Sequence, residues 1–191
     1  MTFNFESTKK DILGKKDKSN VGGIDPPILE LCDLINSNED YFTTSSCSGR
    51  VTLVEDLDKK APGVFLFRSH ERVEFEELKK GLMDAAEKVS EGLVFFKQEP
   101  CLVVVSCRDS DCQWRLFSEA RNNGWKKSGI LSVDKKMLVE LMSSENISFP
   151  VIKDGEILVS DEMLKIVLEK ANGNLAKGWG KIEGLKDKIN K

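Results

Sequence analysis

Apolar residues recur along this chain with two different periods, and the change of period predicts where helices and strands lie. Apolar positions spaced by three and four follow Asp25-Pro26 and Ser160 and also span residues 73–89 and 111–122, so each stretch predicts a helix with one buried face. Asp25 and Ser160 are each expected to cap the helix that follows. Short apolar runs rich in β-branched residues predict strands at 51–54, 64–67, 93–96, 101–105, 130–133, 137–142, 151–153 and 156–159. Asp154-Gly155, between the last two runs, predicts a type I′ hairpin.

The order of these elements predicts the fold class. It is neither strict βαβ alternation nor all-β, and consecutive strands often lie too close for a crossover helix, so antiparallel pairing must be common. We therefore expect one α+β domain over residues 1–191, with a mixed, mostly antiparallel sheet of about six to eight strands and packed helices. Residues 1–20 are expected to form a basic arm, and residues 173–191 a basic tail whose helical stripe is weakened by four glycines. No G-x-G-x-x-G follows a predicted strand, so a Rossmann-type cradle is not expected.

Composition narrows the class of protein. Hydrophobic residues make up 40% of the chain and charged residues 32%, which is typical of a globular protein. No apolar run approaches the roughly 20 residues of a membrane helix, and the N-terminus lacks the apolar region of a secretory signal, so we expect a cytoplasmic protein without a membrane partner. Five cysteines, an odd number, predict free thiols. The chain has no C-x-x-C pair and a single histidine, His70, so no metal site is expected.

The charge of the chain is unevenly distributed, although its net value is only −3. Lysines crowd both ends and acidic residues the middle. The two basic ends could hold a phosphate backbone, or they could be solvated helix faces.

Six small hydroxyl or thiol residues, Thr43–Ser48, are followed by Gly49-Arg50. Such side chains bond to nearby backbone and shape a tight loop, and the amides of such a turn can form a nest for an anion. Arg50 can bind a carboxylate or phosphate in bidentate fashion. The segment therefore predicts a site for an amino-acid-like cofactor or a phosphate, and the alternative is an ordinary polar turn before a strand. Cys47 is a candidate nucleophile if a cation such as Arg50 activates its thiol, or a small inert residue.

Candidate residues for proton transfer and RNA binding lie outside this segment. His70 follows a predicted strand and is a candidate general base, with a structural or solvated role as the alternative. Asp17 lies among Lys15, Lys16 and Lys18, which suit phosphate contacts, although the group could also be a solvated arm. Arg108 ends a buried strand, where it could meet an anion or form a salt bridge at the rim.

Several segments together resemble the family of wybutosine-synthesising tRNA methyltransferases, which includes the third wybutosine-synthesis protein and its archaeal relatives. The resemblance covers about residues 9–175, and one departure is Trp125, where relatives often carry phenylalanine. The segments, in the family's order, are residues 15–19 followed by Gly22 and Asp25, Tyr41–Arg50, Ser69-His70, Glu99-Pro100, Cys107-Arg108, Asn123–Trp125, Ser128–Ile130 and Ala171-Asn172.

The resemblance implies a fold other than the Rossmann methyltransferase and an S-adenosyl-L-methionine-dependent tRNA N-methyltransferase. Its substrate would be the tricyclic guanosine intermediate next to the anticodon of phenylalanine tRNA, methylated at ring position 4.

Side-chain chemistry suggests a role for each candidate residue of such an enzyme. We expect Asp17 or His70 to accept the proton, and Lys15, Lys16, Lys18 and Arg108 to hold the RNA. The cofactor would be bound by Ser45, Ser46, Cys47, Ser48, Gly49 and Arg50. Two other hypotheses remain from the residues themselves, namely a non-catalytic RNA-binding module and a thiol enzyme that uses Cys47.

Overall fold

The computed structural model describes residues 4–14, 23–57, 63–134 and 136–189, and the chain within them divides into two compact units. Unit 1 comprises Met1–Ser48, Cys101–Ser144 and Gly178–Lys191, and unit 2 comprises Gly49–Pro100 and Glu145–Lys177. The described residues form five helices and nine strands. None of these helices is long and apolar enough to cross a lipid bilayer.

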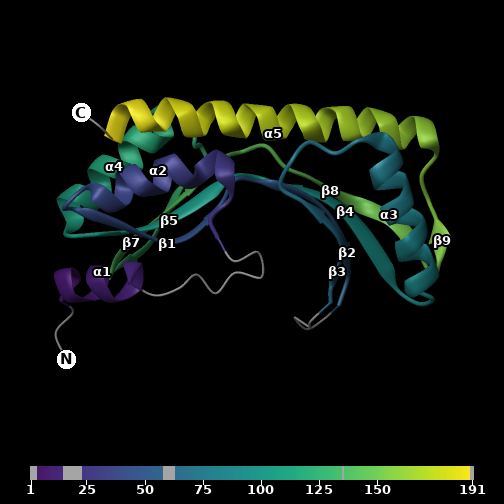
Figure 1. Cartoon of the computed structure of the whole chain (residues 1–191), viewed down its shortest axis with the longest axis horizontal. Coiled ribbons are helices and arrows are strands. Elements are labelled where there is room, and N and C mark those ends of the chain that lie inside the picture. The colour runs from purple at the N-terminus through teal and green to yellow at the C-terminus, as the bar shows by residue number, and fades with distance from the viewer. Residues whose placement is uncertain (1–3, 15–22, 58–62, 135, 190–191) are drawn as a thin grey trace. The chain divides into compact units, whose positions relative to one another are not determined.

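Unit 1 is built on a four-stranded sheet in the order β1-β5-β7-β6, from β1 (Tyr41–Cys47), β5 (Leu102–Cys107), β6 (Gly129–Val133) and β7 (Met137–Met142). Its core joins buried residues of β5 and β7 to those of α2 (Pro26–Ser37), α4 (Ser110–Asn122) and the end of α5 (Asp161–Ile189). Tyr41 belongs to this core. Phe42 follows it in the strand and therefore points to the opposite face, where its ring lies 5.1 Å from Phe5 of α1 (Phe5–Leu13). Helices thus cover both faces of this sheet (Figure 1).

Unit 2 is built on a five-stranded sheet in the order β3-β2-β4-β8-β9. Its strands are β2 (Arg50–Glu55), β3 (Phe65–Ser69), β4 (Leu93–Glu99), β8 (Ile147–Lys153) and β9 (Glu156–Ile157), and α3 (Phe75–Lys88) completes the unit with the first part of α5. Alternate residues of β4 are buried, and the last of them, Gln98, accepts a hydrogen bond of 2.7 Å from Asn174 of α5. Gly81 of α3 lies against the ring of Phe67. Because Phe67 and Phe96 both pair with Leu53, α3 and α5 cover the same face of this sheet.

The predicted class is confirmed, with one difference in how the strands are arranged. Every described strand pair is antiparallel, as expected for an α+β fold and unlike the parallel sheet of a Rossmann enzyme. The strands divide between two sheets, where the sequence predicts one. The Asp154-Gly155 hairpin is confirmed, because both residues have the positive φ of a type I′ turn, 50° and 80°. The single-domain organisation stays a prediction.

The C-terminal segment is helical, as its apolar stripe predicts, and its glycines do not interrupt α5, which runs from Asp161 to Ile189. An interior glycine costs a helix about 1 kcal/mol relative to alanine. Here two of the four glycines allow close packing within unit 1. A Cβ at Gly178 would lie 3.4 Å from the sulfur of Cys101, and one at Gly184 would lie 2.9 Å from Oδ1 of Asn123. Tertiary packing therefore outweighs local helix propensity.

Candidate functional site

The serine-rich segment forms a strand and a tight turn. Thr43–Cys47 lies in β1 and pairs with β5, with a bulge between Thr43 and Ser45, so the loop expected there is wrong for these residues. An extended strand lacks the turn conformation in which successive backbone amides form an anion nest. Only Ser48 and Gly49 lie between β1 and β2, a two-residue connection that we call the turn, and Gly49 has a φ of 93° that other residues rarely adopt.

The turn residue Ser48 binds a carboxylate of the protein itself. Ser48 is 1% exposed, and its backbone N–H and its hydroxyl donate to Oδ2 of Asp25 at 2.8 and 3.1 Å. Asp25 stands before the first residue of α2, as predicted, but its side chain does not cap that helix. A carboxylate that accepts two donors makes a charge-assisted pair, stronger than neutral hydrogen bonds. The sequence predicts donors for an anion at this turn, and the Ser48 donors already bind a carboxylate of unit 1.

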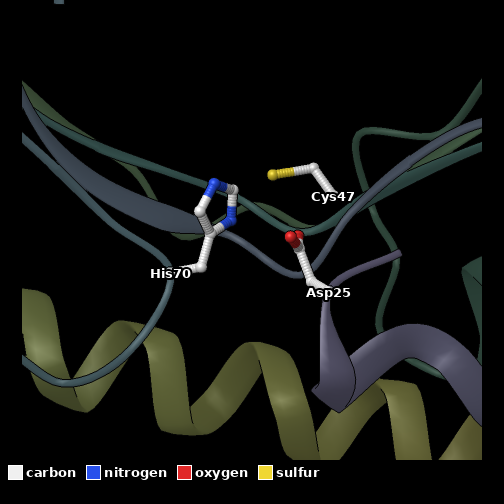
Figure 2. Close-up of side chains that lie close together, drawn as sticks. All are labelled: Asp25, Cys47 and His70. Atoms are coloured by element: carbon white, nitrogen blue, oxygen red, sulfur yellow. The ribbon is translucent and has the colours of Figure 1, made fainter. Parts of the chain in front are cut away.

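Cys47 lies next to this carboxylate. Its Sγ and a carboxylate oxygen of Asp25 are within 4.8 Å, and Figure 2 shows the two side chains close together. Thiolate and carboxylate are both metal ligands, but a zinc site takes about four donors, and these two described donors of unit 1 do not complete one. The absence of metal stays a prediction.

Arg50 begins β2 in unit 2 and already has a partner. Its Nε donates to Glu99, the residue opposite it on β4, and its guanidinium carbon lies 4.8 Å from the centre of the Phe65 ring. The Arg50 side chain is 25% exposed, so the guanidinium remains within reach of solvent. Binding of a cofactor carboxylate by Arg50 stays a prediction.

The candidates for proton transfer fall in different parts of the chain. His70 follows the last residue of β3 in unit 2 and is half-buried, in a bend in which Glu71 donates its backbone N–H to Ser69. Asp17, Lys15, Lys16 and Lys18 lie outside the described residues.

Arg108 forms a rim salt bridge, the alternative considered from the sequence. Its guanidinium donates to Glu6 at 2.7 Å and to Asp40 at 3.0 Å, and lies 5.1 Å from the centre of the Phe5 ring. Hydrogen bonds to these carboxylates raise the pKa of Arg108, so the cation is firmly held. These contacts tie α1 to β1, and an RNA contact by Arg108 stays a prediction. Trp125 lies in the core, 0% exposed.

All five cysteines are free thiols, as predicted. Burial raises the pKa of Cys32 to about 11, that of Cys107 to about 12 and that of Cys112 to about 11. A thiol of this kind is a poor nucleophile at neutral pH, because the thiolate is the reactive form. These three cysteines are therefore packing residues, and Cys101 is buried as well, at 2% exposure. Cys47 is then the one half-buried thiol among the five.

Periodicity and spacing did not reveal that Asp25 is the partner of Ser48, or that Glu99 is the partner of Arg50. The sequence pattern predicts a helix cap at Asp25 and indicates no role for Glu99 beyond its place in the segment Glu99-Pro100. Both belong to the segments that carry the family resemblance, and that was the only signal in the sequence that marked them.

Comparisons with known proteins agree with that resemblance. The sequence matches the family described as Methyltransferase TYW3 over residues 7–191. It is 36% identical to the tRNA(Phe) 7-((3-amino-3-carboxypropyl)-4-demethylwyosine(37)-N(4))-methyltransferase of Archaeoglobus fulgidus, over 97% of this chain and 93% of that protein. The identically named protein of Thermococcus sibiricus is 34% identical, over 98% of this chain and 95% of its own length.

A solved structure shares the fold of this chain. The structure of PH1069 protein from Pyrococcus horikoshii aligns with a TM-score of 0.85 at 32% identity, over 98% of this chain and 94% of that one. A family match along nearly the whole chain, with relatives above 30% identity, shows that the chain belongs to the TYW3 methyltransferase family.

Proposed function

We propose that this protein is an S-adenosyl-L-methionine-dependent tRNA N-methyltransferase of wybutosine biosynthesis. It methylates nitrogen 4 of the tricyclic guanosine intermediate next to the anticodon of phenylalanine tRNA. The observation that carries the proposal is the likeness along almost the whole chain to relatives named for that reaction. Their names describe methylation of a demethylwyosine derivative at position 37 of tRNA(Phe).

The reaction requires few chemical steps from the protein. S-adenosyl-L-methionine supplies a methyl group on a positively charged sulfur, which is already strongly electrophilic. The ring nitrogen forms a bond to the methyl carbon while the carbon–sulfur bond breaks, and the nitrogen loses one proton. The protein must hold the two reactants in line and accept that proton.

Polar groups at the end of β1 suit the amino-acid part of such a cofactor. Ser45 is exposed and Ser46 half-buried, so their hydroxyls can bond to a ligand. Asp25 holds the adjoining turn through Ser48, and its carboxylate suits an ammonium group or ribose hydroxyls. We therefore keep Ser45–Arg50 as the proposed cofactor segment and add Asp25 to it.

For the proton acceptor we propose His70, with Asp17 as the alternative. An imidazole accepts protons near neutral pH without help from its surroundings. His70→Ala should then lower kcat by about 10²- to 10⁴-fold, the usual contribution of a general base, and should remove a rising limb from the pH profile of kcat. Glu71→Ala changes an exposed neighbour and should retain the wild-type rate. If His70→Ala retains both the rate and the pH profile, the role passes to Asp17.

For the RNA we keep Lys15, Lys16, Lys18 and Arg108 as proposed phosphate contacts. Replacing a lysine that touches phosphate should weaken binding of all tRNA sequences alike and lower the salt dependence of binding.

The decisive experiment is transfer of a labelled methyl group from S-adenosyl-L-methionine to phenylalanine tRNA that carries the unmethylated precursor. Unmodified tRNA of the same sequence serves as the control and should remain unlabelled. If the protein binds the cofactor but labels neither RNA, the proposed substrate is wrong. Calorimetry that measures binding of S-adenosyl-L-methionine distinguishes the methyltransferase from the alternative. A non-catalytic RNA-binding module would bind tRNA but would not bind S-adenosyl-L-methionine.

A further inference from the structure

The face of the unit 2 sheet opposite α3 and α5 carries cations and aromatic rings. Residues directly opposite each other in antiparallel strands share a face. Thr52 of β2 pairs with Arg68 of β3 and with Lys97 of β4. The next position on this face, Val54, pairs with Phe95 of β4 in the same register and with Phe65 of β3 after a bulge between Leu53 and Val54. We call the surface formed by Arg50, Phe65, Arg68, Phe95 and Lys97 the basic–aromatic face, and Thr52 lies buried beneath it.

The aromatic rings on this face each lie beside a cation. Arg68 lies 5.7 Å from the centre of the Phe65 ring, and Lys97 lies 5.7 Å from that of Phe95. Phe65 is 39% exposed, which is unusual for so large an apolar side chain in a strand. Since β3 and β4 are separated by β2, the two rings are about 10 Å apart, twice the strand spacing, and cannot stack on the same base.

The positive charge of this face is not neutralised within the described part of the chain. Of its three cations, Arg50 is paired with Glu99. Among the residues that the structure describes, neither Arg68 nor Lys97 lies within 4 Å of a carboxylate. Such a surplus is notable on a chain with a net charge of −3. An anionic partner is the complement that the surplus favours.

A buried hydroxyl lies between the two unpaired cations. Thr52 is 0% exposed, and its Oγ1 has no hydrogen-bond partner among the described residues. Buried polar groups nearly always have a partner. Because this hydroxyl is covered, a phosphate oxygen bound to Arg68 and Lys97 could accept from it only after the covering side chains moved aside.

We infer that the basic–aromatic face binds single-stranded RNA, with one nucleotide on Phe65 and Arg68 and another on Phe95 and Lys97. In each pair the ring takes a base by stacking and the cation takes a phosphate. This combination is the common platform for single-stranded nucleic acid, and RNA loops are recognised through their unstacked bases. The inference rests on the proposed function, which makes the tRNA anticodon loop the RNA in question.

Binding of a fluorescent anticodon stem-loop, followed by anisotropy at several salt concentrations, tests this surface. Arg68→Glu with Lys97→Glu should raise Kd at least about tenfold and reduce the slope of log affinity against log salt by about 1.4, since each single-strand phosphate contact contributes about 0.7. The matched control is Lys80→Glu with Lys170→Glu, which makes the same charge change at exposed helix positions of unit 2. The control should stay within about twofold of the wild type.

Removal of the rings has a different signature. Phe65→Ala and Phe95→Ala, each made alone, should raise Kd about five- to a hundredfold while the salt slope stays unchanged, because stacking is not ionic. The proposal would be overturned if the Arg68/Lys97 charge reversal and the Lys80/Lys170 control raised Kd equally, or if neither raised it.

A second test uses the wild-type protein, so that no variant can misfold, and compares acetylation of its lysines with and without the stem-loop. Bound RNA should slow acetylation of Lys97 and leave that of Lys80 unchanged. If Lys97 reacts equally with and without RNA, the proposal is wrong, and methyl transfer by the same wild-type preparation shows whether the proposed function survives. Protection of Lys97 without methyl transfer would support this surface and contradict the enzyme assignment.

Discussion

Removal of the Asp25 carboxylate should destabilise unit 1 through Ser48. Asp25→Ala leaves a backbone N–H and a hydroxyl, which donate at 2.8 and 3.1 Å, without their acceptor on a residue that is 1% exposed. A buried donor without a partner costs about 1–3 kcal/mol. Asp25 is half-buried, so water can replace part of the loss. We expect the free energy of unfolding to fall by about 2–4 kcal/mol.

Urea unfolding followed by circular dichroism measures this change as a shift of midpoint at constant m. Asp25→Asn keeps an oxygen acceptor but loses the charge, so it should cost only about 1 kcal/mol. Ser48→Ala removes the hydroxyl and retains the amide bond, so its cost should be about 0.5–1.5 kcal/mol. In the double variant Asp25→Ala/Ser48→Ala the two costs should not add, because both include the bond between the hydroxyl and Oδ2.

The reasoning would be refuted by a loss below about 0.5 kcal/mol for Asp25→Ala, or by fully additive costs in the double variant. Either result would mean that the carboxylate does not hold the turn. Loss of methyl transfer at unchanged stability would instead assign Asp25 to the cofactor alone.

Two further predictions concern packing. Gly184→Ala should destabilise the protein by about 1–3 kcal/mol in urea unfolding, because its Cβ would meet Asn123 at 2.9 Å, whereas Gly180→Ala, with no atom within 4 Å, should stabilise it by about 0.5–1 kcal/mol. Equal effects at the two positions would contradict the packing argument. At pH 8 Cys47 should be alkylated by iodoacetamide before Cys107, whose pKa of about 12 leaves almost no thiolate, and mass spectrometry of the digested protein reads the order. Cys107 should react only after unfolding, and its early modification would contradict its burial.

Local patterns anticipated much of the fold. The apolar spacing of 73–89 and 111–122 predicted α3 and α4 to within two residues at each end. The Asp154-Gly155 turn was predicted correctly because its positive φ angles depend on the two residues themselves. Ser160 was predicted to cap the last helix, and its hydroxyl accepts the N–H of Met163 at 3.3 Å.

Other local patterns were misleading where distant contacts prevail. The run of serines and threonines has the composition of a loop, yet pairing with the buried β5 makes it a strand. The glycines of α5 lower its helix propensity, yet close packing against Asn123 and Cys101 keeps the helix continuous. Propensity differences of about 1 kcal/mol are small beside the packing of a whole helix face.

The sequence by itself determined the class of fold, the ends of α3 and α4 and, through several ordered segments, the family. These features depend on neighbours within one helical turn or one strand, or on residue identity alone. Only the tertiary structure decided the partners of the candidate site. Asp25 meets Ser48 across 23 positions and Arg50 meets Glu99 across 49. The basic–aromatic face likewise arises from the register of three strands. Such pairings follow from how the chain closes on itself, and no local period encodes them.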